Sequence, residues 1–268
     1  SIPEFAITLA SALQSIPIGI GTIIGSNTFN ALVIVGVVAM AGTVTLQKKW
    51  VERDIVLNLV VLIITGVFVA FPVFGSANFV GISRSEALVL FVFFLLWVVS
   101  LLRRKEVGGD EEEDTVVFGA FTSFLFICAG IVGVFAGGHW VVYGGERIAD
   151  IFGVSNMLIG LTLVAVGSSL PELTVSLAAM YSRKISLAVG NIIGSNIFDF
   201  LGILGITGLI APIIIDSTFR FDVWVSFGAL SFLYLFARFN GNYIITRNEG
   251  LVLILTYVLY IVVAIFRG

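Results

Sequence analysis

The sequence contains the same polar motif twice, each time inside long apolar stretches. Pro3-Glu4 precedes Gly25-Ser26-Asn27-Thr28-Phe29-Asn30, and Pro171-Glu172 precedes Gly194-Ser195-Asn196-Ile197-Phe198-Asp199. Each copy places a glutamate and a second polar side chain among Ile, Leu, Val, Ala and Phe. A carboxylate in such surroundings is costly unless it meets a cation, a partner or water. The duplication therefore predicts a cation pathway at the interface between two related halves.

The composition indicates a polytopic membrane protein. Of 268 residues, 59% are hydrophobic and 12% are charged, and the mean hydropathy is +1.12. Soluble domains carry about 25% charged residues. We expect the lipid bilayer as the surroundings and no nucleic acid as a partner. A single cysteine excludes disulfides within the chain.

Apolar segments of about 20 residues are long enough to cross the roughly 30 Å hydrocarbon core of a bilayer. The sequence predicts one partial span and eight full ones, in this order: Ile2–Leu13, Ile16–Leu46, Asp54–Phe71, Ser85–Leu102, Thr115–Ile151, Val154–Tyr181, Ile185–Pro212, Phe221–Ala237 and Glu249–Phe266. The charged segment 103–114 separates an N-terminal half, 1–102, from a C-terminal half, 115–268.

The distribution of Lys and Arg predicts the orientation, because cytoplasmic loops are enriched in these residues. Alternating spans place ten of the fourteen on one side. The linker 103–114 is therefore expected in the cytoplasm and the C-terminus on the opposite face of the plasma membrane. The ten are Lys48, Lys49, Arg53, Arg103, Arg104, Lys105, Arg183, Lys184, Arg238 and Arg247.

The two motifs lie on helices that run in opposite directions through the membrane. This arrangement predicts an all-α inverted-topology repeat of two five-helix halves. The second half carries Thr115–Ser168 ahead of its motif, and the first half has no equivalent stretch before Ser1. We expect that the first helix and part of the second belong to an N-terminal segment of the same protein that is missing here. The alternative is a protein that evolved without that helix.

The residue types in the motifs suit a hard cation. Proline within a membrane helix frees a backbone carbonyl one turn earlier, near Gly167 for Pro171. Carbonyl, hydroxyl and carboxylate oxygens are the ligands that Ca²⁺ prefers. The deep carboxylates supply up to three negative charges, and His and Cys ligands are lacking, which argues against zinc or copper. The candidate side-chain oxygen ligands are those of Glu4, Glu172, Asp199, Asn30, Ser26 and Ser195.

Some motif residues also fit a purely structural role. Gly21 with Gly25, and Gly190 with Gly194, have the spacing of small residues that pack membrane helices together. We interpret these glycines as packing residues. For Asn27 and Asn196, helix packing and ion binding both remain open.

At these residues the chain resembles the sodium/calcium exchanger family of the cation/Ca²⁺ exchanger superfamily, and its prokaryotic members in particular. The resemblance is most specific in Gly167-Ser168-Ser169-Leu170-Pro171-Glu172 and in Gly190–Asn196. It implies ten helices in two inverted halves that exchange cytoplasmic Ca²⁺ for external Na⁺. Ca²⁺ and Na⁺ would be cargo, with no resident cofactor.

The resemblance also implies a ligand set. Glu4 and Glu172 would be central, flanked by Asn30 and Asp199, with hydroxyl and carbonyl ligands from Ser26, Ser195, Ser168, Ser169, Ser1 and Ala165. Proton/calcium exchangers typically have Gly-Asn-Ala before the glutamate, and potassium-dependent exchangers tend to have a carboxylate in place of Asn30. Both departures favour a Na⁺-coupled, potassium-independent exchanger.

The prediction is thus a secondary active antiporter that works by alternating access, and not an enzyme. In family members two long, tilted helices are thought to slide, and Thr115–Ile151 would be one of them. A proton-coupled Ca²⁺/cation antiporter and, less favoured, a cation channel are the alternatives. An intramembrane aspartyl protease needs two deep aspartates, and Asp199 is the only aspartate that lies deep in a predicted span and not near its end. The oligomeric state stays open.

Overall fold

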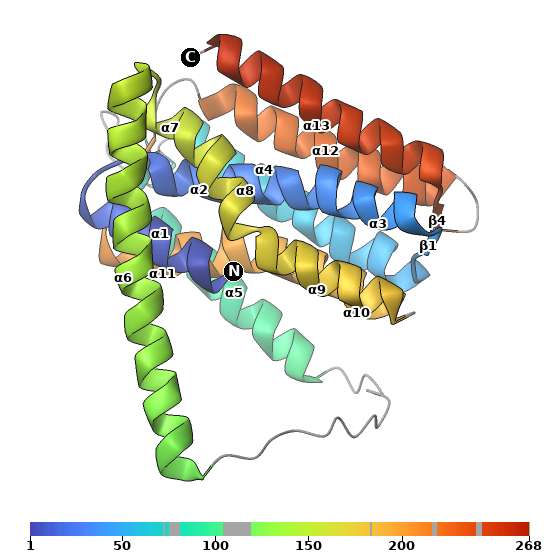
Figure 1. Ribbon diagram of the computed structural model, residues 1–268, viewed down its shortest axis with the longest axis horizontal. Helices are drawn as coiled ribbons and strands as arrows, with labels where there is room; N and C mark the ends of the chain where they lie inside the picture. The colour runs from blue at the N-terminus through green and yellow to red at the C-terminus, as the bar shows by residue number, and fades with distance from the viewer. Residues whose placement is uncertain are drawn as a thin grey trace.

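The computed structural model describes residues 1–71, 73–74, 81–103, 119–182, 184–215, 219–239 and 243–267, and these form a helical bundle (Figure 1). Most of the linker 103–114 lies outside the described residues. Most helices run side by side, and α6 (Ala120–Phe152) crosses the bundle at one side (Figure 1).

Three of the long helical rods contain a π-helical turn, η, in mid-rod. The first half consists of α1 (Ile2–Leu13), then α2 (Ile18–Phe29) continuing through η1 (Asn30–Ile34) into α3 (Val35–Ala41), then η2 (Trp50–Ile55) leading into α4 (Val56–Ala70), and α5 (Arg84–Arg103). After α6 come α7 (Asn156–Ile159), η3 (Gly160–Val164), α8 (Ala165–Ser168), α9 (Leu170–Tyr181), α10 (Ile185–Ile197), η4 (Phe198–Ile203), α11 (Leu204–Ile210), α12 (Phe219–Phe239) and α13 (Arg247–Arg267).

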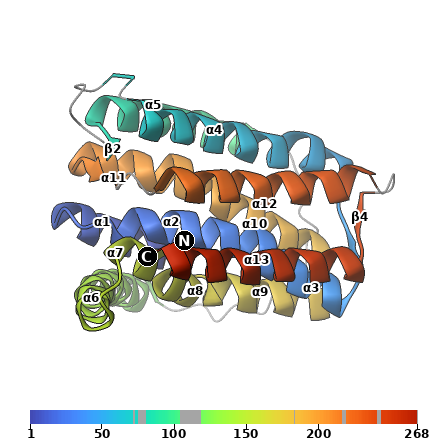
Figure 2. The ribbon, with the colours of Figure 1, turned by 90° about the horizontal axis from the view of Figure 1, so that it is seen from above.

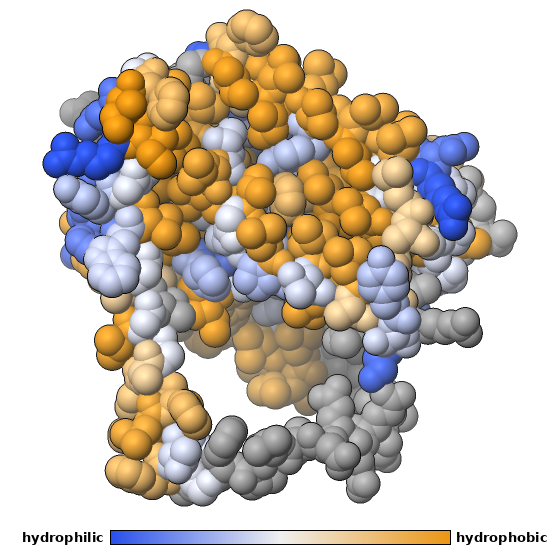
Figure 3. Space-filling model, in the orientation of Figure 1, coloured by the Kyte–Doolittle hydropathy of each residue, from blue (hydrophilic) through white to orange (hydrophobic). Residues whose placement is uncertain are grey.

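Within the described residues, six helical rods are long and apolar enough to span a membrane: Ile18–Ala41, Arg84–Arg103, Asn156–Tyr181, Ala188–Ile210, Phe221–Phe239 and Arg247–Arg267. This is fewer than the eight full spans predicted. The predicted span Asp54–Phe71 falls short because α4 has only 15 residues after a charged turn. In α6, the apolar stretch identified is Phe121–Gly130. The face of the molecule shown in Figure 3 is broadly apolar between polar ends, as contact with a bilayer requires.

Two short antiparallel ribbons connect the halves at opposite ends of the bundle (Figure 2). The strand β1 (Val44–Thr45) pairs with β4 (Ile244–Ile245), and β2 (Gly81–Ile82) pairs with β3 (Ile213–Ile214). Each ribbon joins one strand from each half. Helices also pair across the two halves: α13 packs on α3, and α5 packs on α11.

Side-chain contacts repeat the relationship between the halves. Phe29 packs edge-on against Tyr257 with ring centroids 5.5 Å apart, and Phe198 packs against Phe94 at the same distance. Both α5 and α13 begin with a capping box, in which a hydroxyl and a glutamate three residues later satisfy each other's backbone N–H groups. The pairs are Ser83 with Glu86 and Thr246 with Glu249. These matched contacts support the inverted repeat predicted from the motifs.

The helix α2 lies in the centre of the bundle, and all of its residues are buried. Its glycines allow close approach to the second half: a Cβ on Gly25 would lie 2.3 Å from the Leu161 carbonyl oxygen, and one on Gly21 would lie 2.7 Å from that of Met157. The packing role predicted for these two glycines is confirmed. Gly190 and Gly194 differ, because no described atom lies within 4 Å of a Cβ placed on either. The described first half also holds no counterpart of α6 through α8, the elements that cover α2.

Candidate cation-binding site between the two halves

The two motif glutamates lie in the first turns of the helices that follow the predicted breaks. Pro3 stands at the start of α1 and Pro171 at the start of α9. The break in the second half falls at Ser169, between α8 and α9. Proline is tolerated at a helix start because its missing N–H has no intrahelical acceptor there. The first turn also favours a carboxylate, because the helix dipole is positive at that end.

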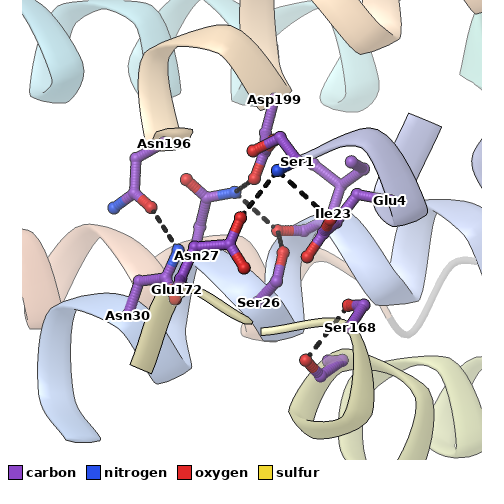
Figure 4. A network of polar contacts seen from close by, with 11 residues as sticks. Ser1, Glu4, Ile23, Ser26, Asn27, Asn30, Ser168, Glu172, Asn196 and Asp199 are labelled. Atoms are coloured by element: carbon purple, nitrogen blue, oxygen red, sulfur yellow. Dashed lines mark hydrogen bonds and ion pairs between the residues drawn. The ribbon is translucent and has the colours of Figure 1, made fainter. Parts of the chain in front are cut away.

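The side chains of Glu4 and Glu172 reach the same point from opposite halves (Figure 4). The amino group of Ser1 lies 2.6 Å from Glu172 Oε1 and 3.7 Å from Glu4 Oε2. Glu4 is 1% exposed and Glu172 is 6% exposed. The two carboxylates therefore face each other inside the protein, across the space of one small group.

The second pair of predicted ligands lies at π-helical turns. Asn30 is the first residue of η1, and Asp199 belongs to η4. Both are buried, and each is held by an asparagine from the opposite half. Asn27 Nδ2 donates to Asp199 Oδ2 at 2.9 Å, and Asn30 Nδ2 donates to Asn196 Oδ1 at 3.0 Å (Figure 4). Single π turns inside α-helices are frequent at functional sites.

These side chains leave several buried oxygens without a hydrogen-bond partner among the described residues. Native structures pair most buried polar atoms, so a cluster of unpaired oxygens needs an explanation. All of these atoms are acceptors or hydroxyls, which suits a cation and does not suit an anion. They are Glu4 Oε2, Glu172 Oε2, Asp199 Oδ1, Asn30 Oδ1, Asn27 Oδ1, Ser1 Oγ and Ser169 Oγ.

The other predicted ligands are placed less directly. Ser168 Oγ donates to the Ala165 carbonyl at 3.2 Å, and that carbonyl also accepts from the Ser169 N–H at 3.1 Å. Ser26 Oγ donates to the Ile23 carbonyl at 3.1 Å. Ser195 is half-buried. Among the described residues, no three His, Cys, Asp or Glu side chains form a metal-binding group by themselves. A cation here would therefore need amide, hydroxyl or carbonyl oxygens as well.

The sequence reasoning missed one contact that positions the site. Thr28 Oγ1 and Ser226 Oγ share a hydrogen bond that joins α2 to α12, and Thr28 also donates to the Ile24 carbonyl at 2.8 Å. Ser226 lies outside both motifs, so nothing in the motif pattern pointed to it. The hydrogen bond between Thr28 and Ser226 holds α2 against α12. The helix α2 carries Ser26 and Asn27 and leads into Asn30.

Comparison with known proteins identifies the family. The model of the family described as "Sodium/calcium exchanger protein" matches residues 1–103 and 122–266. The chain belongs to this family. The match confirms the resemblance inferred from the two motifs.

Proteins similar to this chain include two named relatives and a solved structure. The sodium/calcium exchanger MaX1 of Methanosarcina acetivorans is 31% identical, with 99% of this chain and 85% of that protein aligned. The putative antiporter CaxA of Alkalimonas amylolytica is 29% identical over 97% of this chain and 82% of its own length. A structure of the sodium-calcium exchanger NCX_Mj, soaked with Na⁺ and Sr²⁺, superposes with a TM-score of 0.68 at 28% identity and covers 97% of this chain and 81% of that one. As a family member, this exchanger-type protein is a multi-pass membrane protein of a transporter family.

Proposed function

We propose that this protein is a secondary active antiporter that exchanges Ca²⁺ for Na⁺ across the plasma membrane by alternating access. The observation that carries the proposal is the set of buried oxygens without a hydrogen-bond partner around Glu4 and Glu172, where the two halves meet. Further support comes from MaX1, which is named a sodium/calcium exchanger, and from NCX_Mj, a sodium-calcium exchanger soaked with Na⁺, Ca²⁺ or Sr²⁺.

The proposed ligands form an inner and an outer group. Glu4, Glu172, Asp199 and Asn30 are the inner group, with the hydroxyls of Ser1 and Ser169, because each has a buried oxygen without a hydrogen-bond partner in the described structure. The outer group consists of Ser26, Ser195, Ser168 and the Ala165 carbonyl, which have other bonds or are partly exposed. Six to eight oxygens are the usual number around Ca²⁺.

Charge provides the coupling in this proposal. One Ca²⁺ offsets two of the three negative charges, and several Na⁺ can offset all three, so the two ions compete for the same oxygens. An empty site would carry unpaired negative charge through the membrane interior, and that is costly. The loaded protein can therefore change state while the empty protein cannot, and obligatory exchange follows.

The proposed orientation places the segment 103–114 in the cytoplasm and the C-terminus outside. A cysteine at position 112 (Glu112→Cys) in a Cys128→Ala background tests it. We expect a membrane-impermeant thiol reagent to label this cysteine only after intact cells are opened. Labelling of intact cells would reverse the orientation.

The central test measures ⁴⁵Ca²⁺ uptake into Na⁺-loaded proteoliposomes containing the full-length protein, with and without an outward Na⁺ gradient. We expect saturable uptake that requires the gradient and is abolished by Glu172→Gln. Asp150→Asn is the matched control, because Asp150 is an exposed carboxylate at the end of α6. Uptake driven by a pH gradient instead would indicate a proton-coupled antiporter, and uptake that does not saturate would indicate a channel.

A further inference from the structure

Asn30 has the one inner side chain whose two ends differ chemically. Its amide carries an oxygen that can bind a cation and an NH₂ group that repels one. The side chain is buried, so the group that faces the site depends on the neighbouring protein atoms. Carboxylates such as Glu4 and Glu172 have two equivalent oxygens and do not meet this problem.

Asn196 supplies the atom that resolves the ambiguity. It lies in α10 of the opposite half, and its Oδ1 accepts a hydrogen bond from Asn30 Nδ2 at 3.0 Å. With its NH₂ group engaged, Asn30 keeps Oδ1 buried and without a partner in the described structure. Asn196 thus holds the repelling end of Asn30 away and leaves the coordinating end free (Figure 4).

The counterpart contact shows that this arrangement is not a general packing bond. Asn27 occupies the position equivalent to Asn196, yet it donates to Asp199 Oδ2 at 2.9 Å and to the Ile23 carbonyl at 2.8 Å. The two asparagines therefore use opposite ends of their amides, and each choice matches the chemistry of its partner. In both pairs one oxygen of the inner residue remains free: Asn30 Oδ1 and Asp199 Oδ1.

We infer that Asn196 is a positioning residue that fixes the amide of Asn30 with its oxygen towards the transported cation. This inference rests on the proposed function, since it assumes that a cation binds at this point. It assigns to Asn196 a role that the motif alone left open between packing and ion binding. Asn196 itself need not touch the ion.

The test compares Asn196→Leu in two backgrounds, because a carboxylate at position 30 has no wrong end. The Ca²⁺ dissociation constant is measured by equilibrium binding of ⁴⁵Ca²⁺ to the purified full-length protein. In the native background we expect Asn196→Leu to weaken binding about tenfold, the effect of one lost hydrogen bond of ordinary strength. In an Asn30→Asp background we expect the same substitution to change binding less than about twofold.

Controls separate this inference from the proposed function. Asn58→Leu removes a buried asparagine of α4 whose amide has no partner in the described structure, and it should leave binding unchanged. If Asn196→Leu does not fold, Asn196→Ala provides the same comparison. Native binding after Asn196→Leu, or equal loss in both backgrounds, would overturn the inference. Failure of the unaltered protein to bind Ca²⁺, or binding that survives Glu172→Gln, would instead overturn the proposed site.

Discussion

Gly138 of α6 lies directly against Ala6 of α1, and a Cβ at Gly138 would lie 2.9 Å from the carbonyl carbon of Ala6. Real Cβ atoms essentially never come this close to the backbone of a neighbouring helix. Ala6 is only two residues from Glu4, so α6 packs against α1 close to the candidate site.

We therefore expect Gly138→Val to reduce Na⁺-driven Ca²⁺ uptake at least about tenfold, because the added side chain must push α6 away from α1. Gly133→Val is the matched control on the same helix, since a Cβ there meets no described atom within 4 Å. Uptake by both variants is measured in proteoliposomes at equal protein content. Equal rates for the two would show that close contact between α6 and α1 is not needed for transport.

Ca²⁺ should stabilise the protein against heat. A ligand that binds only the folded state adds about 2.7 kcal/mol at a concentration one hundred times its Kd. We expect the Tm of the detergent-solubilised protein to rise with Ca²⁺ and to return on chelation, and we expect Glu172→Gln to remove the rise. A rise that persists in Glu172→Gln would place the bound ion elsewhere.

Glu86 lies outside the candidate site, and we expect it to contribute to the stability of the fold. It is fully buried and accepts hydrogen bonds from the backbone N–H groups of Ser83, at 2.8 Å, and Val73, at 3.0 Å. Glu86→Ala leaves the N–H groups of Ser83 and Val73 without this acceptor and removes a charged hydrogen-bonding group from the interior, at a cost of about 1–3 kcal/mol. Thermal unfolding measures the change, and Lys48→Ala, at an exposed side chain, should have little effect. An unchanged Tm for Glu86→Ala would mean that water replaces the lost acceptor.

Because Asp222 and Arg267 form an ion pair, we expect substitutions at the two positions to have non-additive effects on stability. Arg267 Nη2 lies 2.7 Å from Asp222 Oδ2, and Asp222 is fully buried. Arg267→Gln leaves a buried carboxylate without its cation, and we expect a loss of about 3 kcal/mol. Adding Asp222→Asn should restore part of that stability, measured again by thermal unfolding. Additive losses would show that the two charges do not depend on each other.

The duplicated motif was sufficient to predict the inverted repeat and the approach of Glu4 and Glu172 to one another where the halves meet. The order of the predicted spans gives the direction of each helix, and the repeated motif shows which residues of the two halves are equivalent. The partners across the interface could not be predicted, because a motif records spacing along one helix and not distances between helices. The bonds from Asn27 to Asp199 and from Asn30 to Asn196 are of this kind.

Other differences also have physical causes. The equivalence of Gly21 and Gly25 with Gly190 and Gly194 suggested equal packing, whereas only the first pair meets a neighbouring helix in the described structure. Strands of two residues are too short to leave a periodic signal, so neither ribbon was predicted.

Those two ribbons restrict how a protein of this shape can move. Each ties a strand of one half to a strand of the other, one ribbon at either end of the bundle, and α3–α13 and α5–α11 interlock the halves between them. These connections oppose a hinge motion in which the two halves separate as rigid bodies. Under the proposed alternating access, we therefore expect the motion that opens the interior to either side to involve α6, which lies outside these connections and packs mainly on α1.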